Sequence, residues 1–90
     1  MELGELNRQN NYELIDIRDN YSYSLGHLPK ARNIPYYNLL GNFSHYLNKS
    51  NYYILYCDYG KQSKEISDRL NSFGYNTTSL KGGYLGYKNK

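Results

Sequence analysis

The seven residues NYYILYC, at positions 51–57, constrain the fold of this 90-residue chain more than any other segment. After the first residue the run is continuously apolar or aromatic, which is typical of a strand buried on both faces of a parallel sheet. A short polar loop with one glycine follows, and Ile66, Leu70 and Phe73 then recur at helical spacing. The pattern predicts a strand, a tight loop and an amphipathic helix that stops at Gly74.

The rest of the chain alternates between strand-like and helix-like patterns. Alternation of this kind favours an α/β fold in which helices cover both faces of a parallel sheet. In such sheets, ligands bind at the carboxyl ends of the strands, and Cys57 lies at one of these ends. Strands are expected at residues 12–17, 31–34, 51–57 and 76–80. Helical segments are expected at 2–9, within 20–30, at 37–47 with an interruption at Gly41, at 63–73 and from Tyr84 onward.

Length and composition narrow the functional classes. Ninety residues indicate a single domain over residues 1–90. The formal net charge of +3 is spread along the chain without a basic block, so no nucleic-acid partner is expected. RNA binding by stacking on the thirteen tyrosines has only aromatic abundance and mild basicity in its favour. No apolar run approaches a membrane span and no signal-peptide pattern is present, so we expect no membrane association and a cytoplasmic location.

Cys57 is the only cysteine in the chain. A single thiol forms no internal disulfide and no C-x-x-C redox pair, and one cysteine with two histidines gives no metal-site spacing. We therefore expect no bound metal. His27 follows a turn glycine and is interpreted as a structural residue, whereas His45 is expected to be exposed.

The setting of Cys57 indicates a reactive sulfur. The helix that follows offers unpaired N–H groups and the positive end of its dipole, and Gly60 allows the loop to turn its N–H groups inward. These features stabilise a thiolate. The alternative is that Cys57 is only the last buried residue of its strand, because free cysteine is often buried.

Two cysteine chemistries suit such a loop. A cysteine phosphatase or arsenate reductase needs arginine after five intervening residues to grip its oxyanion, and that position here is Ser63. Sulfur transfer needs only one cysteine, which takes a sulfane sulfur and holds it as a persulfide, Cys–S–S⁻. Inward N–H groups would stabilise this anion as well. The sequence therefore favours sulfur transfer.

Four segments together resemble the single-domain rhodanese-like (thiosulfate sulfurtransferase) family. The resemblance implies a three-layer α/β/α sandwich around a mostly parallel sheet of four to five strands. The family usually has a strand before the first helix, and few residues precede Leu3 here, so this N-terminal strand is expected to be missing or short. The resemblance also implies that Cys57 is the nucleophile, followed by an anion-binding loop of Asp58, Tyr59, Gly60, Lys61, Gln62 and Ser63. The segments are LIDIRD (14–19), GHLPKARNIP (26–35), YCDYGKQS (56–63) and FGYNTTSLKGGYLGY (73–87).

The same resemblance assigns supporting roles. Asp16 and Arg18 lie two residues apart at a strand end and so face the same side, and they are expected to brace the active-site side of the sheet through ion pairing and hydrogen bonds. Lys81 is expected on the same rim as Cys57, where it could attract an anion. Asp58 departs from the family pattern because it adds a negative charge beside the thiolate, which Lys61 is expected to offset. Asp58 would oppose thiosulfate if it pointed inward, and sulfur would then come from a protein persulfide or a small organic donor.

Two functions follow as hypotheses. The first is a sulfurtransferase that moves sulfur from thiosulfate or a persulfide donor to a thiol, such as a thioredoxin-like protein, or to cyanide. It needs no cofactor beyond the covalent sulfur on Cys57. The second is a non-catalytic binding or regulatory module whose cysteine is idle, a reading that Asp58 motivates.

Overall fold

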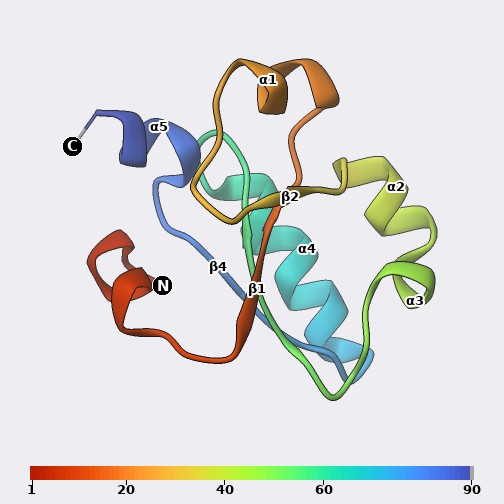
Figure 1. Cartoon of the computed structure of the whole chain (residues 1–90). Coiled ribbons are helices and arrows are strands. Elements are labelled where there is room, and N and C mark those ends of the chain that lie inside the picture. Colours follow the sequence, from red (N-terminus) through yellow and green to blue (C-terminus); the bar gives the residue numbers. More distant parts are fainter. Residues whose placement is uncertain (90) are drawn as a thin grey trace.

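Four parallel strands form the sheet that the alternating pattern predicts. In the computed structural model, which describes residues 1–89, the strand order is β2-β1-β3-β4 (Figure 1). β1 and β3 pair along their whole length, from Tyr12 beside Tyr52 to Asp16 beside Tyr56. The strands are β1 (Tyr12–Asp16), β2 (Arg32–Asn33), β3 (Tyr52–Tyr56) and β4 (Asn76–Ser79).

Helices cover both faces of this sheet, as expected for three layers (Figure 1). Side chains of α2, α3 and α4 pack on one face, and side chains of η1, α1 and α5 pack on the other. The elements are the 3-10 helix η1 (Leu3–Arg8) and the α-helices α1 (Asn20–Leu25), α2 (Tyr36–Gly41), α3 (Phe43–Tyr46), α4 (Lys61–Ser72) and α5 (Gly83–Lys88).

Alternation along β3 divides the buried side chains between two cores. Tyr53, Leu55 and Cys57 join the core beneath α4, whereas Ile54 and Tyr56 join the core on the side of α5. All five of these residues are at most 5% exposed. The continuous apolar run therefore reflects burial on both faces of the sheet. Odd-numbered residues of this segment point to one face and even-numbered residues point to the other.

Three expected boundaries were wrong in detail. The helix expected over 37–47 is broken at Asn42, whose non-helical backbone (φ −152°, ψ 43°) separates α2 from α3. The strand expected over 31–34 is reduced to two residues of regular pairing. The helix expected from Ser63 begins at Lys61, because Gly60 at φ 103° already serves as its N-cap.

The outer edge of β4 is covered by groups other than a fifth strand. The Met1 ammonium donates to the Ser79 carbonyl at 2.7 Å, and the Met1 carbonyl accepts from Lys81 N–H at 2.8 Å. The Asn71 side chain accepts from Thr77 N–H at 2.8 Å and donates to the Thr77 carbonyl at 3.0 Å. These contacts satisfy backbone groups that an open edge would present to another chain.

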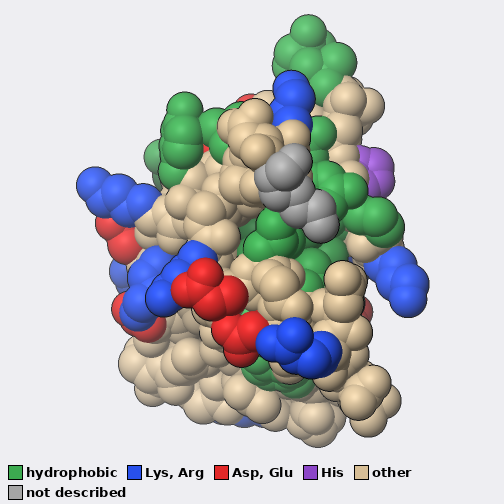
Figure 2. All heavy atoms as spheres, turned by 90° about the vertical axis from the view of Figure 1, so that its left-hand side faces the viewer, with side chains coloured by type: hydrophobic (Ala, Val, Ile, Leu, Met, Phe, Trp, Pro, Cys, Tyr) green, Lys and Arg blue, Asp and Glu red, His purple; other side chains and the backbone are tan. Residues whose placement is uncertain are grey.

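The face that carries η1 and α5 shows acidic and basic side chains beside one another (Figure 2). One ion pair joins Lys81 Nζ to Glu2 Oε1 at 3.1 Å.

None of the helices described over residues 1–89 has the length and hydrophobicity that crossing a membrane requires.

The start of α5 holds the residues that follow β3. Tyr84 N–H donates to the Cys57 carbonyl at 2.8 Å, and Leu85 N–H donates to the Asp58 carbonyl at 3.0 Å. Gly83 makes this approach possible, since a Cβ there would overlap the Cys57 carbonyl oxygen and lie 2.6 Å from that of Asp58. Its φ of 56° also lies in the left-handed region.

Gly83→Ala should therefore lower the free energy of unfolding by about 3 kcal/mol, combining steric overlap with left-handed strain. Gly86→Ala is the matched control in the same helix, because its Cβ would meet nothing closer than 3.9 Å. That change should be neutral or stabilising by up to about 1 kcal/mol. Urea denaturation of both variants checks this, and equal stabilities would contradict the packing argument.

Candidate active site

Cys57 lies at the carboxyl end of β3, and its sulfur meets the first turn of α4. Sγ accepts hydrogen bonds from Gly60 N–H at 3.2 Å and from Ser63 N–H at 3.3 Å. The Ser63 amide is one of the first-turn donors that a helix leaves unpaired. Both N–H groups and the helix dipole therefore favour negative charge on this sulfur.

A pair of buried serines lies beneath the sulfur. Ser63 Oγ is 3.5 Å from Cys57 Sγ and 2.7 Å from Ser79 Oγ, and it donates to the Gly60 carbonyl at 3.2 Å. Ser63 is fully buried and Ser79 is 7% exposed. Because the Ser63 hydroxyl reaches several acceptors, it can turn toward Sγ when the sulfur is ionised while Ser79 donates to it.

A second buried hydroxyl pair joins α4 to β4 one turn further on. Ser67 Oγ lies 2.6 Å from Thr77 Oγ1, and neither group contacts the sulfur. The polar residues Ser63, Ser67 and Asn71 thus recur every four positions along α4 and face β4.

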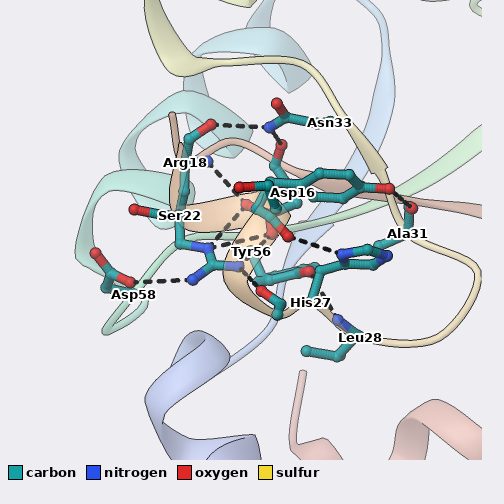
Figure 3. Close-up of polar contacts among 12 residues, drawn as sticks. Asp16, Arg18, Ser22, His27, Leu28, Ala31, Asn33, Tyr56 and Asp58 are labelled. Carbon is teal, nitrogen blue, oxygen red and sulfur yellow. Dashed lines mark hydrogen bonds and ion pairs between the residues drawn. The ribbon is translucent and has the colours of Figure 1, made fainter. Parts of the chain in front are cut away.

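Asp16 and Arg18 form a buried ion pair at the carboxyl end of β1, close to Tyr56 (Figure 3). Arg18 donates from Nε to both Asp16 oxygens at 3.0 and 3.1 Å and from a terminal nitrogen at 2.7 Å. The same terminal nitrogen donates to the Gly26 carbonyl at 2.6 Å. The Arg18 guanidinium also lies 4.1 Å from the centre of the Tyr84 ring. This one side chain connects β1, the turn after α1, and α5.

Arg18 also approaches Asp58, with a nitrogen–oxygen distance of 3.6 Å (Figure 3). Arg18 therefore forms the ion pair described for this carboxylate, and Lys61 lines the same cavity as Asp58, so the expected offset by Lys61 stays a prediction. Arg18 reaches Asp58 because Asp16 anchors it at the end of the neighbouring strand. The Asp58 side chain is 53% exposed.

Tyr56 completes the buried polar group around Asp16. Its hydroxyl accepts from Leu28 N–H at 3.1 Å and is hydrogen-bonded to Asp16. Burial raises the pKa of Tyr56 above that of an ordinary tyrosine; the Leu28 N–H opposes this shift, and the Asp16 carboxylate adds to it. Asn33 secures the end of β1 by donating to the carbonyls of Asp16 and Arg18 at 2.9 and 2.8 Å.

A cavity of about 570 Å³ opens over Cys57 at the carboxyl ends of the strands. Of the residues expected from the sequence, it is lined by Arg18, Cys57, Asp58, Tyr59, Lys61 and Gln62. Gly60 and Ser63 contact the sulfur from below, and Asp16 lies behind Arg18.

Lys81 follows β4 at the same edge of the sheet at which Cys57 follows β3, but it does not line this cavity. It contacts Glu2 and lines a neighbouring groove together with Tyr59 and Gly60.

Sequence reasoning missed several residues of the site. The further lining residues are Ile17, Asp19, Pro35, Tyr36, Tyr37 and Glu65, and Ser79 supports Ser63 from β4. The sequence contained a signal for three of these residues. Pro35, Tyr36 and Tyr37 come shortly after β2, which runs in the same direction as β3. Residues at that point face the same rim.

Neither histidine lines the cavity. His27 stacks on Tyr23 at a ring separation of 3.8 Å, and its Nδ1 lies 2.9 Å from the Tyr23 carbonyl oxygen. Within residues 1–89, the structure brings together no three His, Cys, Asp or Glu side chains able to hold a metal ion.

Comparison with protein families identifies the fold. Residues 2–90 match the rhodanese-like domain family, so the chain belongs to that family. A rhodanese-related protein of Thermoplasma volcanium superposes with a TM-score of 0.90 at 21% identity, covering 99% of this chain and 89% of that one. A Staphylococcus saprophyticus protein gives a TM-score of 0.81 at 25% identity over 92% and 86% of the two chains.

The same fold also occurs within a longer chain. The reduced CoADR-RHD of Bacillus anthracis matches with a TM-score of 0.83 at 22% identity, covering 93% of this chain and 15% of that one. None of the curated proteins compared with the chain matches it.

The buried Tyr56 hydroxyl predicts a dependence of stability on alkaline pH. A raised pKa in the folded state means that the contribution of Tyr56 is complete below about pH 10, where tyrosine ionises in the unfolded chain, and falls as the pH rises further. Tyr56→Phe should cost about 1–2 kcal/mol near neutral pH, because it leaves the Leu28 N–H unpaired. Above pH 10 this deficit should shrink by about 1.4 kcal/mol per pH unit. Urea denaturation at pH 7 to 11 checks this, and a constant deficit would contradict it.

Proposed function

We propose that this chain is a sulfurtransferase in which Cys57 takes a sulfane sulfur from thiosulfate or a persulfide donor and passes it to a thiol or to cyanide. The observation that carries the proposal is the pair of N–H groups, from Gly60 and Ser63, that point at Sγ within 3.3 Å. Membership of the rhodanese-like family supports the same reaction.

The loading step is a displacement at sulfur. The Cys57 thiolate attacks the outer sulfur of the donor, the new S–S bond forms, and the electron pair of the old bond leaves with the donor remnant. Thiosulfate releases sulfite, and an organic persulfide releases its thiolate. No electrons are gained or lost overall, so the step needs no oxidant or reductant.

The charge of the intermediate explains why the first turn of α4 suits this reaction. Both the starting thiolate and the persulfide are anions, and the amides of Gly60 and Ser63 are held in place by the helix before either forms. Preorganised donors of this kind stabilise developing charge without the cost of reorganisation.

Discharge completes the cycle when an acceptor attacks the outer sulfur of the persulfide. A thiol acceptor, such as that of a thioredoxin-like protein, would reach Cys57 through the same cavity of about 570 Å³. The cycle requires no cofactor apart from the sulfur itself, and we propose that it takes place in the cytoplasm.

The direct test is the mass of the protein after incubation with thiosulfate or a persulfide donor. We expect a gain of one sulfur atom in the unmodified chain and no gain in Cys57→Ala. Absence of the gain with every donor would remove the enzymatic proposal and leave a rhodanese-like binding or regulatory module.

The Ser63 hydroxyl should assist the anionic sulfur in addition to the two amides. Ser63→Ala keeps the backbone N–H but removes the hydroxyl, and we expect about a tenfold slower loading, the equivalent of one hydrogen bond to a charged group. Ser67→Ala removes an equally buried hydroxyl one turn away that does not contact the sulfur. It should leave the loading rate unchanged, and equal slowing in both variants would show that the effect is only structural.

A further inference from the structure

The cavity over Cys57 is larger than a small inorganic donor requires. Its volume of about 570 Å³ falls within the range of roughly 300–1,000 Å³ typical of sites for small organic ligands. Thiosulfate would fill little of it, so the remaining walls are free to recognise groups attached to the sulfur that is transferred.

Carboxylates outnumber cations in the lining. Asp19, Asp58 and Glu65 line the cavity, against Arg18 and Lys61. The charge of Arg18 is already balanced by Asp16 behind it. The lining is therefore acidic in a chain whose formal net charge is +3, and composition alone does not account for it.

The two carboxylates away from the thiolate loop are accessible to a ligand in the cavity. Asp19 is exposed and caps α1 by accepting from Ser22 N–H at 2.8 Å, which holds the pKa of Asp19 below its usual value. Glu65 is exposed on α4 and belongs to none of the ion pairs described for residues 1–89. A dianion such as thiosulfate is repelled by both groups.

Tyrosine rings form a second, independent feature of the same cavity. Tyr36, Tyr37 and Tyr59 line it, and Tyr37 and Tyr59 are 77% and 76% exposed. Tyr36 and Tyr37 meet edge to face, with ring centres 5.1 Å apart. The face of a tyrosine ring attracts ammonium and guanidinium groups, so rings and carboxylates together favour an organic cation.

We propose that the sulfur donor of this site is an organic persulfide that carries a positive charge near its sulfur, with Asp19 and Glu65 as the residues that select this charge. The inference rests on the proposed sulfur transfer and specifies its substrate class. Loading then follows Cys57–S⁻ + R–S–SH → Cys57–S–SH + R–S⁻, where R bears the cation and the S–S electron pair leaves with R–S⁻. The outer sulfur then passes its proton to R–S⁻, which gives R–SH and the anionic persulfide Cys57–S–S⁻.

A donor series of matched size tests the proposal. The persulfides of cysteamine, 2-mercaptoethanol and 3-mercaptopropionate differ mainly in a terminal ammonium, hydroxyl or carboxylate. The initial rate of sulfur gain on Cys57 is followed by mass spectrometry, with thiosulfate as a fourth donor. Each rate is divided by the rate of the same donor with a neutral cysteine derivative in solution, which removes differences in intrinsic reactivity.

We expect the normalised rates to fall in the order cation, neutral, anion, with about a tenfold difference between the ends that shrinks as salt is added. Glu65→Gln and Asp19→Asn should each reduce the preference about threefold. Asn retains the capping ability of Asp19. Asp68→Asn is the control, because Asp68 lies on the same helix, contacts Lys64 and does not line the cavity.

The source of the charge is distinguished with a short peptide that carries a cysteine persulfide between arginines. Faster loading from this peptide than from cysteamine persulfide would assign the donor to a polypeptide, and slower loading would assign it to a small aminothiol.

Failure of this inference differs from failure of the proposed function. Loading at equal normalised rates, fastest loading from thiosulfate or the carboxylate donor, or a preference that both variants leave unchanged would overturn the charge selection while sulfur transfer stands. Absence of loading from every donor would overturn the sulfur transfer itself.

Discussion

The buried ion pair between Asp16 and Arg18 is the interaction on which the arrangement of the site depends. Arg18 is held in one position by its contacts to the Asp16 carboxylate. From there it reaches the Gly26 carbonyl, the Tyr84 ring and Asp58. Removing one partner of such a pair leaves an uncompensated charge in the interior, which is costly. The loop over Cys57 is therefore fixed from below by a group on the neighbouring strand.

The second constraint is the junction between α4 and β4. Apolar residues of α4 pack beneath the sheet, and the serines of the same helix face the hydroxyls of β4. Ser63 belongs to this polar stripe and also contacts the sulfur of Cys57. The packing of α4 against β4 therefore also places the hydrogen-bond donors at Sγ. The amides at the start of α4 then need no separate support to point at Cys57.

Much of the fold could be predicted from the sequence because burial on both faces leaves a continuous apolar strand and helices leave a periodic stripe. Residues 51–57 and the pair Ile66 and Leu70 carried both signals clearly, whereas Phe73, at the same spacing, follows the end of α4 and is 48% exposed. Gly41 indicated an interruption of this helix, but the break lies one residue later, at Asn42, and the spacing of Leu39, Leu40, Phe43 and Leu47 continues across it. Its cause is the backbone conformation of one residue, which the hydrophobic pattern does not record.

The site could be predicted only where its residues are close to one another in the sequence. Cys57, Gly60 and the helix start lie together in sequence, and the structure keeps them together. The partner of Asp58 was missed because Arg18 lies forty residues away and reaches it only through strand pairing. The contact of Lys81 with Glu2 was missed for the same reason, since it depends on the N-terminal residues lying beside β4. Charge pairs across strands depend on register and side-chain direction, which the sequence pattern alone does not set.

The central claim is that the first turn of α4 holds an anionic sulfur on Cys57. The most direct measurement is an amide NMR spectrum recorded before and after sulfur loading, with mass spectrometry on the same sample. The account predicts the gain of one sulfur atom together with the largest amide shifts at Gly60 and Ser63. A sulfur gain that leaves both amides unmoved, or a sample that takes up no sulfur from any donor, would contradict it.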